Sequence, residues 1–377
     1  MLQQTQVATV IDYYNRWMEK WPTLQELAKA TLEDVNTMWS GLGYYSRGRR
    51  LLEGVKKVVE ELNGKMPATA EDLVKALPGV GRYTAGAIAS IAFNQTTGLV
   101  DGNVVRVLCR MRMVGADCTS QPVQDMLWSH ANKLVDQERP GDFNQSLMEL
   151  GATVCTPKTP SCSECPVKVE YEKKAAVSKW TKAKVTDEDN NIPDIECAEE
   201  SCKLCIPSTE EWDPSDGVMN YPRKPKKKPP REETTSVCLV CCHHQEKSKR
   251  KFLLLKRKEQ GLLAGLWEFP SLKQEGAKKE EAEVWLQTNY SLCLPADTQI
   301  EHVGQVVHHF SHITQTYVVD CLVLSEDMEL DVGGDNWEWK WMTGREFLTS
   351  AISTAMKKVF NAFEKGADKI PVKVMIE

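Results

Sequence analysis

A short glycine-containing turn constrains this chain more than any other feature. The segment Pro78-Gly79-Val80-Gly81 stands directly before the apolar run Thr84–Ala92, and Asp101 follows it further along the chain. Proline and two glycines allow a tight turn whose backbone N–H groups approach a phosphate without side chains in the way. The apolar run predicts a helix, and anions are favoured at a helix N-terminus. The motif therefore predicts a phosphate-binding turn followed by a carboxylate.

Composition limits the classes of protein that fit. The 377 residues leave room for two domains and a connector. The net charge of −6 does not exclude nucleic acid, because phosphate contacts need only a local basic face. No stretch approaches the roughly 20 apolar residues of a membrane span. Thirteen cysteines without a secretory signal indicate a reducing compartment and metal ligation rather than disulfides.

The hydrophobic pattern changes along the chain. Three- and four-residue spacings predict short helices at 25–39, 50–63, 84–93, 104–113 and 122–135. Strands are expected at 236–240, 251–256, 305–309 and 316–324, with a closing helix at 353–364. We predict a helical domain at 1–172, a polar connector at 173–235, an α+β domain at 236–366 and a tail at 367–377.

Two groups of cysteines have the spacing of metal ligands. Cys155, Cys162 and Cys165 follow a predicted helix, and three thiolates so placed can wrap one metal centre, although a 4Fe-4S cluster needs four. Cys197, Cys202 and Cys205 lie in the connector and suit zinc, with a fourth ligand from elsewhere. Unliganded thiols are the alternative for each group.

Several segments together resemble one family. Leu2-Gln3-Gln4-Thr5-Gln6, Gly41-Leu42-Gly43-Tyr44-Tyr45 and Gly141-Asp142-Phe143-Asn144-Gln145 are similar to segments of the MutY-type adenine DNA glycosylases. Leu262–Pro270 and Ser353–Phe360 resemble the vertebrate form, so the likeness covers nearly the whole chain. It implies a multidomain fold, with an all-α helix–hairpin–helix glycosylase domain carrying an iron–sulfur loop, followed by an α+β Nudix-like (MutT-like) domain. The implied activity is base excision repair: hydrolysis of the N-glycosidic bond of adenine mispaired with 8-oxoguanine or guanine in double-stranded DNA.

The resemblance also assigns roles to residues. Asp101 is the expected catalytic carboxylate, with Tyr83 and Asn103 beside it. Endonuclease III-like relatives carry a lysine where Tyr83 stands, so the expected reaction leaves the strand uncut. The residues expected to contact DNA are Gln3, Gln4, Tyr44, Gly79, Val80 and Gly81, with Gln145 facing the extruded adenine and Phe310, Ser311 and His312 sensing 8-oxoguanine. Ordinary packing of Tyr44, a solvated position for Gln145 and unliganded strand-edge histidines are the alternatives.

Two departures from the family pattern leave rival readings open. The fourth cluster ligand falls on Tyr171, so a connector cysteine substitutes, the cluster is labile, or it is absent. The family's general-acid glutamate corresponds to a position before Met1, which predicts an impaired form that binds 8-oxoguanine·A pairs without excision. A bifunctional endonuclease III-like enzyme is disfavoured by Tyr83. A Nudix hydrolase is disfavoured because 276–287 lacks the family's metal-binding box.

The connector suggests partners and a location. Ile192–Glu196 resembles the segment by which the family docks a checkpoint clamp, and an abasic-site endonuclease is a second expected partner there. The basic run at 223–231 fits a nuclear import signal or a phosphate-contacting arm, and a solvated linker is the alternative. We expect a monomer in the nucleus, with mitochondria as a second location.

Overall fold

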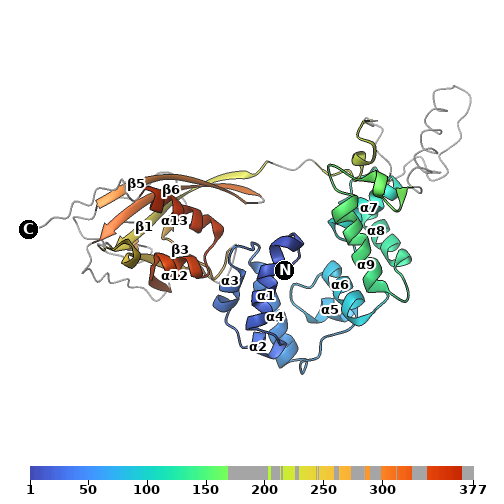
Figure 1. Ribbon diagram of the computed structural model, residues 1–377, viewed down its shortest axis with the longest axis horizontal. Helices are drawn as coiled ribbons and strands as arrows, with labels where there is room; N and C mark the ends of the chain where they lie inside the picture. Colours follow the sequence, from blue (N-terminus) through green and yellow to red (C-terminus); the bar gives the residue numbers. More distant parts are fainter. Residues whose placement is uncertain are drawn as a thin grey trace, which may run out of the picture. The chain divides into compact units, whose positions relative to one another are not determined.

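Two compact units make up the chain. The computed structural model describes residues 1–168, 203–204, 213, 215–225, 229–242, 244, 246–258, 263–272, 284, 286–288, 299–310, 312–324 and 338–366 (Figure 1). The first unit joins Met1–Gly64 to Lys228–Glu377, and the second unit is Lys65–Lys227. The division into domains at residues 172, 235 and 366 stays a prediction. In the described residues, no helix is both long and apolar enough to span a membrane.

The first unit begins with four helices, α1 (Val7–Lys20), α2 (Leu24–Ala28), α3 (Leu32–Trp39) and α4 (Ser46–Glu60). The prediction of one helix over 25–39 was wrong, because two capping boxes occur in close succession. Thr23 and Glu26 cap α2, and Thr31 and Asp34 cap α3 in the same way. Each threonine accepts from a backbone N–H three residues on, so each starts a new helix.

The rest of the first unit is a mixed sheet with helices. Its strands are β1 (Arg231–Cys242), β2 (Lys251–Lys256), β3 (Trp267–Glu268), β4 (Ser271–Leu272), β5 (Gln299–His309), β6 (Ile313–Leu324) and β7 (Trp339–Thr343). The order is β3-β2-β1-β6-β5, with β7 on β2 and β4 on β1, and the β1–β6 pair is parallel. A 3-10 turn (Lys247–Lys249) and helices α12 (Gly344–Thr349) and α13 (Thr354–Gly366) complete it, with α13 against β5 and β6.

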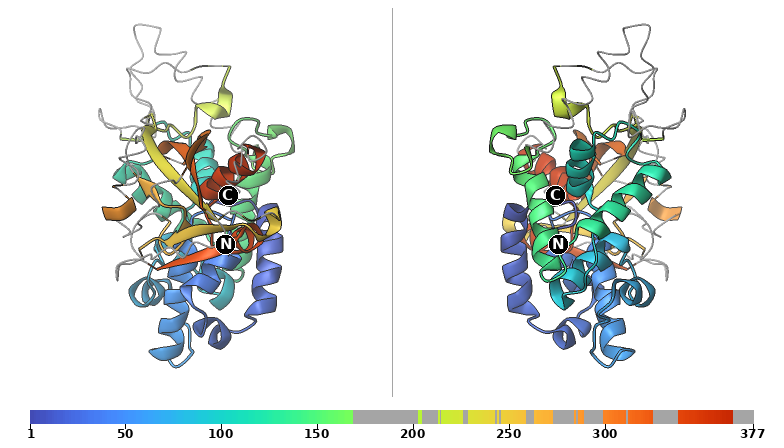
Figure 2. Two further views of the ribbon diagram at one scale, coloured as in Figure 1. Left: turned by 90° about the vertical axis from the view of Figure 1, so that its left-hand side faces the viewer. Right: turned by 90° about the vertical axis from the view of Figure 1, so that its right-hand side faces the viewer.

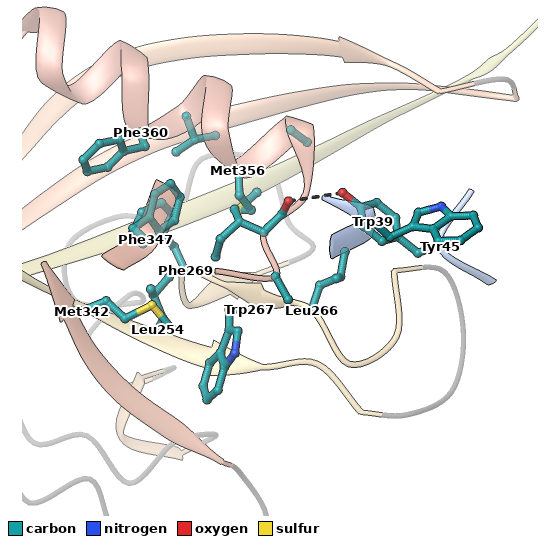
Figure 3. Close-up of a cluster of buried hydrophobic side chains, with 14 of the residues drawn as sticks. Trp39, Tyr45, Leu254, Leu266, Trp267, Phe269, Met342, Phe347, Met356 and Phe360 are labelled. Atoms are coloured by element: carbon teal, nitrogen blue, oxygen red, sulfur yellow. Dashed lines mark hydrogen bonds between the residues drawn. The ribbon is translucent and has the colours of Figure 1, made fainter. Parts of the chain in front are cut away.

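One hydrophobic core runs from the early helices into the sheet. Trp39 of α3 and Leu254 of β2 are buried in the same cluster as Phe347 of α12 and Phe360 of α13 (Figure 3). At the helix end of the cluster, the hydroxyl of Tyr45 donates to the carbonyl of Ile352 at 3.3 Å. Helices α1–α4 and the C-terminal sheet therefore fold around shared side chains.

The second unit is helical, as Figure 2 shows from two further sides. It contains α5 (Ala70–Ala76), α6 (Arg82–Phe93), α7 (Gly102–Arg112), α8 (Gln121–Leu134), α9 (Pro140–Glu149), a π-helical turn (Leu150–Val154) and 3-10 turns at Cys162–Glu164 and Gly217–Asn220. Its elements cross closely at glycines. A Cβ on Gly86 would lie 2.8 Å from the carbonyl oxygen of Gly98, and one on Gly98 would lie 2.5 Å from the backbone of Ala131. Small residues at these crossings therefore set the packing of α6 and α8.

Candidate functional site

The predicted turn stands at the start of α6. Gly79 has φ +74°, a conformation that side chains disfavour. Gly81 is the N-cap residue with no side chain to cap the helix, and a Cβ there would meet nothing within 4 Å. Both glycines are exposed, and Val80 is half-buried. The first N–H groups of this 12-residue helix therefore have no side-chain cap and are suited to an anion.

Asp101 is the N-cap residue of α7. Its Oδ1 accepts from the backbone N–H of Asn103 at 2.9 Å and of Val104 at 2.7 Å. Its Oδ2 accepts from the Asn103 side-chain amide at 3.0 Å. The carboxylate is half-buried and fixed in orientation by three donors. The structure thus brings Asp101 and Asn103 together as the sequence predicts.

Tyr83 is the second residue of α6 and interacts electrostatically with Asp101. Burial raises the pKa of its phenol, and the nearby Asp101 carboxylate raises it further. The hydroxyl donates to the sulfur of Met148 at 3.5 Å rather than to Asp101. Tyr83 therefore interacts with Asp101 through charge, and its phenol stays protonated at neutral pH.

Two buried arginines of α7 connect Asp101 to the cysteine loop. Arg106 donates to the side-chain oxygen of Asn103 at 2.8 Å and to the carbonyl of Cys155 at 2.6 Å. Arg110 donates to the sulfur of Cys155 at 3.3 Å and to the carbonyl of Thr156 at 2.8 Å. A continuous chain of hydrogen bonds therefore runs from the carboxylate of Asp101 through Asn103 and Arg106 to Cys155.

The cysteine loop matches an iron–sulfur site only in part. The backbone N–H of Ser161 donates to the carbonyl of Val154 at 2.9 Å. The backbone N–H of Cys165 donates to the carbonyl of Cys162 at 3.4 Å. Burial raises the pKa of Cys162, and the charges of Cys155 and Cys165 raise it further. The thiols are therefore within electrostatic reach of one another and have the right donor type. Within the described ranges, no group of three or more candidate ligands could hold a metal ion by itself.

Several predicted ligands fall outside the described residues. They are Cys197, Cys202 and Cys205, and the same holds for Tyr171 at the expected fourth cluster position and for Ser311, which was expected to sense 8-oxoguanine. The same holds for Ile192–Glu196 and for 226–228 of the basic run. Gln145 is exposed on α9, where its amide donates to the carbonyl of Gly141 at 3.1 Å. Its contact with adenine stays a prediction.

In the first unit, Arg47 contacts two segments that were predicted to bind DNA, the one around Gln3 and Gln4 and the turn that carries Tyr44. Its guanidinium donates to the carbonyls of Met1 at 2.8 Å and Gly43 at 3.1 Å, and also to that of Gln3. It lies 5.3 Å from the ring centre of Tyr44, which is half-exposed with φ +50°. Gln4 is exposed with φ +55°. One half-buried cation therefore holds the segment around Gln3 and Gln4 against the turn that carries Tyr44.

A cavity of about 560 Å³ lies between this turn and the sheet. Tyr44 lines it from the helices, and Phe310 and His312 line it from the β5–β6 turn. Phe310 packs edge-on against His308, with ring centres 4.5 Å apart. The cavity also has Arg49, Arg50 and His309 in its wall, and no carboxylate among its described lining residues. It is an aromatic pocket with basic groups, suited to a base and its phosphate.

Three arginines are functional candidates that sequence reasoning missed. Arg106 and Arg110 are four residues apart in α7, among valine, leucine and cysteine side chains, and both are buried. That spacing places them on one face of the helix, and a buried arginine needs acceptors. This signal was present in the sequence. Arg47 gave no such signal, because its partners are carbonyls scattered over the first 43 residues.

Comparison with known proteins identifies the family. Residues 1–133 match the HhH-GPD superfamily of base excision DNA repair proteins, and residues 239–362 match the NUDIX domain. The chain is 54% identical to the adenine DNA glycosylase of Rattus norvegicus, over 97% of this chain and 70% of that protein. The chain belongs to the adenine DNA glycosylase family. The human enzyme is 53% identical over 97% of this chain and 66% of its own length.

Solved structures give partial matches. A thermostable thymine-DNA glycosylase matches with 26% identity and a TM-score of 0.40, covering 46% of this chain and 80% of its own. The family and the two domain matches confirm a helix–hairpin–helix glycosylase part followed by a Nudix-like part, and an adenine DNA glycosylase of base excision repair. They do not favour the alternative of a lesion-binding protein without excision activity.

Proposed function

We propose that this adenine DNA glycosylase removes adenine paired with 8-oxoguanine and leaves the strand uncut. The observation that carries the proposal is the fixed carboxylate of Asp101 at the start of α7, held by Asn103 and Val104. Because its donors are already in place, the carboxylate needs no reorganisation to stabilise a positive charge developing nearby.

The leaving group dictates the chemistry. Loss of adenine gives the sugar oxocarbenium character, and a carboxylate on one side stabilises that cation, as in glycoside hydrolysis. Asp101 takes this role. Adenine departs poorly as an anion and must be protonated, a step that contributes about 10²–10⁴-fold. No residue of this sequence is assigned to that proton transfer. The base must also leave the stack to be reached.

Strand cleavage requires an amine that this site lacks. A Schiff base requires an amine such as that of a lysine side chain, and Tyr83, whose phenol cannot form one, occupies the corresponding position of α6. The raised pKa of Tyr83 keeps its phenol neutral. The product is therefore an abasic site in an intact strand.

We place the 8-oxoguanine in the cavity of the first unit. Tyr44, Phe310 and His312 are far apart in sequence, yet all three line one cavity of about 560 Å³. This shared lining supports the placement. A purine stacked on such rings is a common mode of nucleic-acid binding. Guanine in the same place is the second expected ligand.

A 4Fe-4S cluster is part of the proposal. Cys155, Cys162 and Cys165 would supply three ligands, and the fourth comes from outside the described residues or the cluster is labile. Zinc at Cys197, Cys202 and Cys205 is proposed on the same basis. Iron, sulfide and zinc analysis of the purified protein tests both. No step of the reaction above uses either group.

Clamp and endonuclease partners, a monomeric state and a nuclear or mitochondrial location are also proposals. They depend on the connector, whose residues 192–196 lie outside those described.

One experiment separates the proposed reaction from its rivals. Duplexes carrying 8-oxoguanine·A, G·A or T·A are incubated with enzyme, with and without borohydride. We expect an abasic product from the first two duplexes and no trapped covalent adduct. A borohydride-trapped adduct would contradict the monofunctional reaction.

A further inference from the structure

Glu33, in the first turn of α3, reaches into the C-terminal sheet. Its Oε1 accepts from the indole N–H of Trp267 at 2.9 Å and from Lys340 at 3.4 Å, and its Oε2 accepts from Lys256 at 3.3 Å. These partners are between 223 and 307 residues away in sequence. We call Glu33, Lys256, Trp267 and Lys340 the Glu33 cluster. It ties a helix from the start of the chain to strands β2, β3 and β7.

The same face of α3 contacts the segment just before Trp267. A Cβ on Gly265 would lie 3.2 Å from Leu32 Cδ2 and 3.3 Å from Asn36 Nδ2. Leu263 and Ala264 of this segment line the cavity, and so does Asn36. The position of α3 on the sheet therefore sets the position of one cavity wall.

Glu33 supplies the negative charge that faces Lys256 and Lys340 and the acceptor for the indole of Trp267. Trp267 is 1% exposed, and both lysines lie over its ring, at 4.4 Å for Lys340 and 5.5 Å for Lys256. Without Glu33, a buried indole N–H loses its acceptor and two ammonium groups face the same ring. Lys256 has a second partner in Glu338 at 2.8 Å.

The neighbouring Asn36 cannot take over this role. It is fully buried, and within the described part of the chain neither polar atom of its amide has a hydrogen-bond partner. A buried amide without partners costs free energy. The polar attraction between α3 and segment 263–267 therefore comes from Glu33.

We propose that Glu33 is a positioning residue for 8-oxoguanine recognition. It holds α3 on the sheet, so that the wall carrying Tyr44 and the wall carrying Phe310 keep the spacing that a modified purine needs. The proposal deepens the proposed function and rests on it, because it takes the cavity to be the 8-oxoguanine site.

The test compares two substrates in three variants. Single-turnover adenine release is measured on 8-oxoguanine·A and G·A duplexes, and the ratio of the two rates is the preference. Glu33→Ala should lower the preference about tenfold, with the G·A rate within twofold, since a hydrogen bond to a charged group has this magnitude. Glu33→Gln should lower it less, because its amide oxygen still accepts from Trp267. The control Glu61→Gln removes an exposed pair with Lys57 on α4 and should change nothing.

Other outcomes overturn the proposal. An unchanged preference in Glu33→Ala, or an equal fall on both duplexes, means that Glu33 has only a structural role. Hydrogen exchange of residues 263–269 gives a readout without excision, and Glu33→Ala should exchange faster there than Glu61→Gln. If the wild-type protein releases adenine from neither duplex, the proposed function fails, and exchange alone decides: unchanged protection at 263–269 rejects the role of Glu33.

Discussion

At the scale of single residues, Asp101 has a structural and a chemical role that can be separated. As N-cap it accepts from Asn103 and Val104, and asparagine caps helices about as well as aspartate. Asp101→Asn should therefore keep the melting temperature and DNA affinity. It loses the negative charge, so adenine release should fall by about 10²–10⁴-fold, the range for one catalytic group. A fall of less than tenfold would contradict the assigned role.

Arg106 gives a second prediction at this scale. It is 7% exposed and satisfies acceptors on Asn103, Gly151 and Cys155. Arg106→Leu removes all three hydrogen bonds and leaves the buried carbonyl of Gly151 without this donor, whereas the carbonyl of Cys155 keeps Arg110 at 3.4 Å. The substitution should lower the free energy of unfolding by about 2–4 kcal/mol. Urea unfolding measures it. Arg139→Leu is the control, because that side chain is 75% exposed in a pair with Asp142 and should cost less than about 0.5 kcal/mol. Similar losses in both variants would refute the network.

At the scale of helices, substituting two glycines by alanine separates the effect of helix propensity on stability from the effect of close packing. Gly54 lies inside α4 with nothing within 4 Å of its missing Cβ, so Gly54→Ala should stabilise by about 0.5–1 kcal/mol. Gly86 lies inside α6, and a Cβ added there would lie 2.8 Å from the carbonyl oxygen of Gly98. Gly86→Ala should destabilise by about 1–3 kcal/mol through overpacking. Thermal unfolding of the two variants should shift in opposite directions, and equal shifts would show that α6 does not cross Gly98 closely.

Local signals in the sequence predicted the local structure of the candidate site around the turn and Asp101. The turn at Gly79 and Gly81 depends on conformational freedom that only glycine has, and Asp101 stands where an N-cap residue belongs. The split between α2 and α3 was also readable, because Thr31 and Asp34 form a capping box. The apolar periodicity of 25–39 hid this signal, since both helices bury apolar side chains in the same core.

At the scale of the whole molecule, the grouping of residues 1–64 with the C-terminal sheet was beyond sequence reasoning. It depends on contacts such as Ser40 to Ile352 at 3.1 Å, between segments 312 residues apart. No periodicity or motif encodes such a pair. The cavity was invisible for the same reason, although Tyr44 and Phe310 were each singled out from their own motifs.

The Glu33 cluster makes the first unit sensitive to acid. Burial by itself would raise the pKa of Glu33, but the hydrogen bond from Trp267 and the charges of Lys256 and Lys340 lower it overall. A lowered pKa contributes stability above the unfolded value, near 4.3, which is lost as pH falls through the folded value. The melting temperature of wild type should exceed that of Glu33→Gln at pH 7, and the gap should narrow as the pH falls below the pKa that Glu33 has in the unfolded chain. A gap that persists in acid would contradict this.

The most direct test of the central claim is single-turnover adenine release from an 8-oxoguanine·A duplex, with binding to the same duplex measured in parallel. We expect the wild-type chain to bind the duplex and release adenine, while Asp101→Asn binds equally well and releases almost none. Tight binding by the wild-type chain with no release of adenine would contradict it.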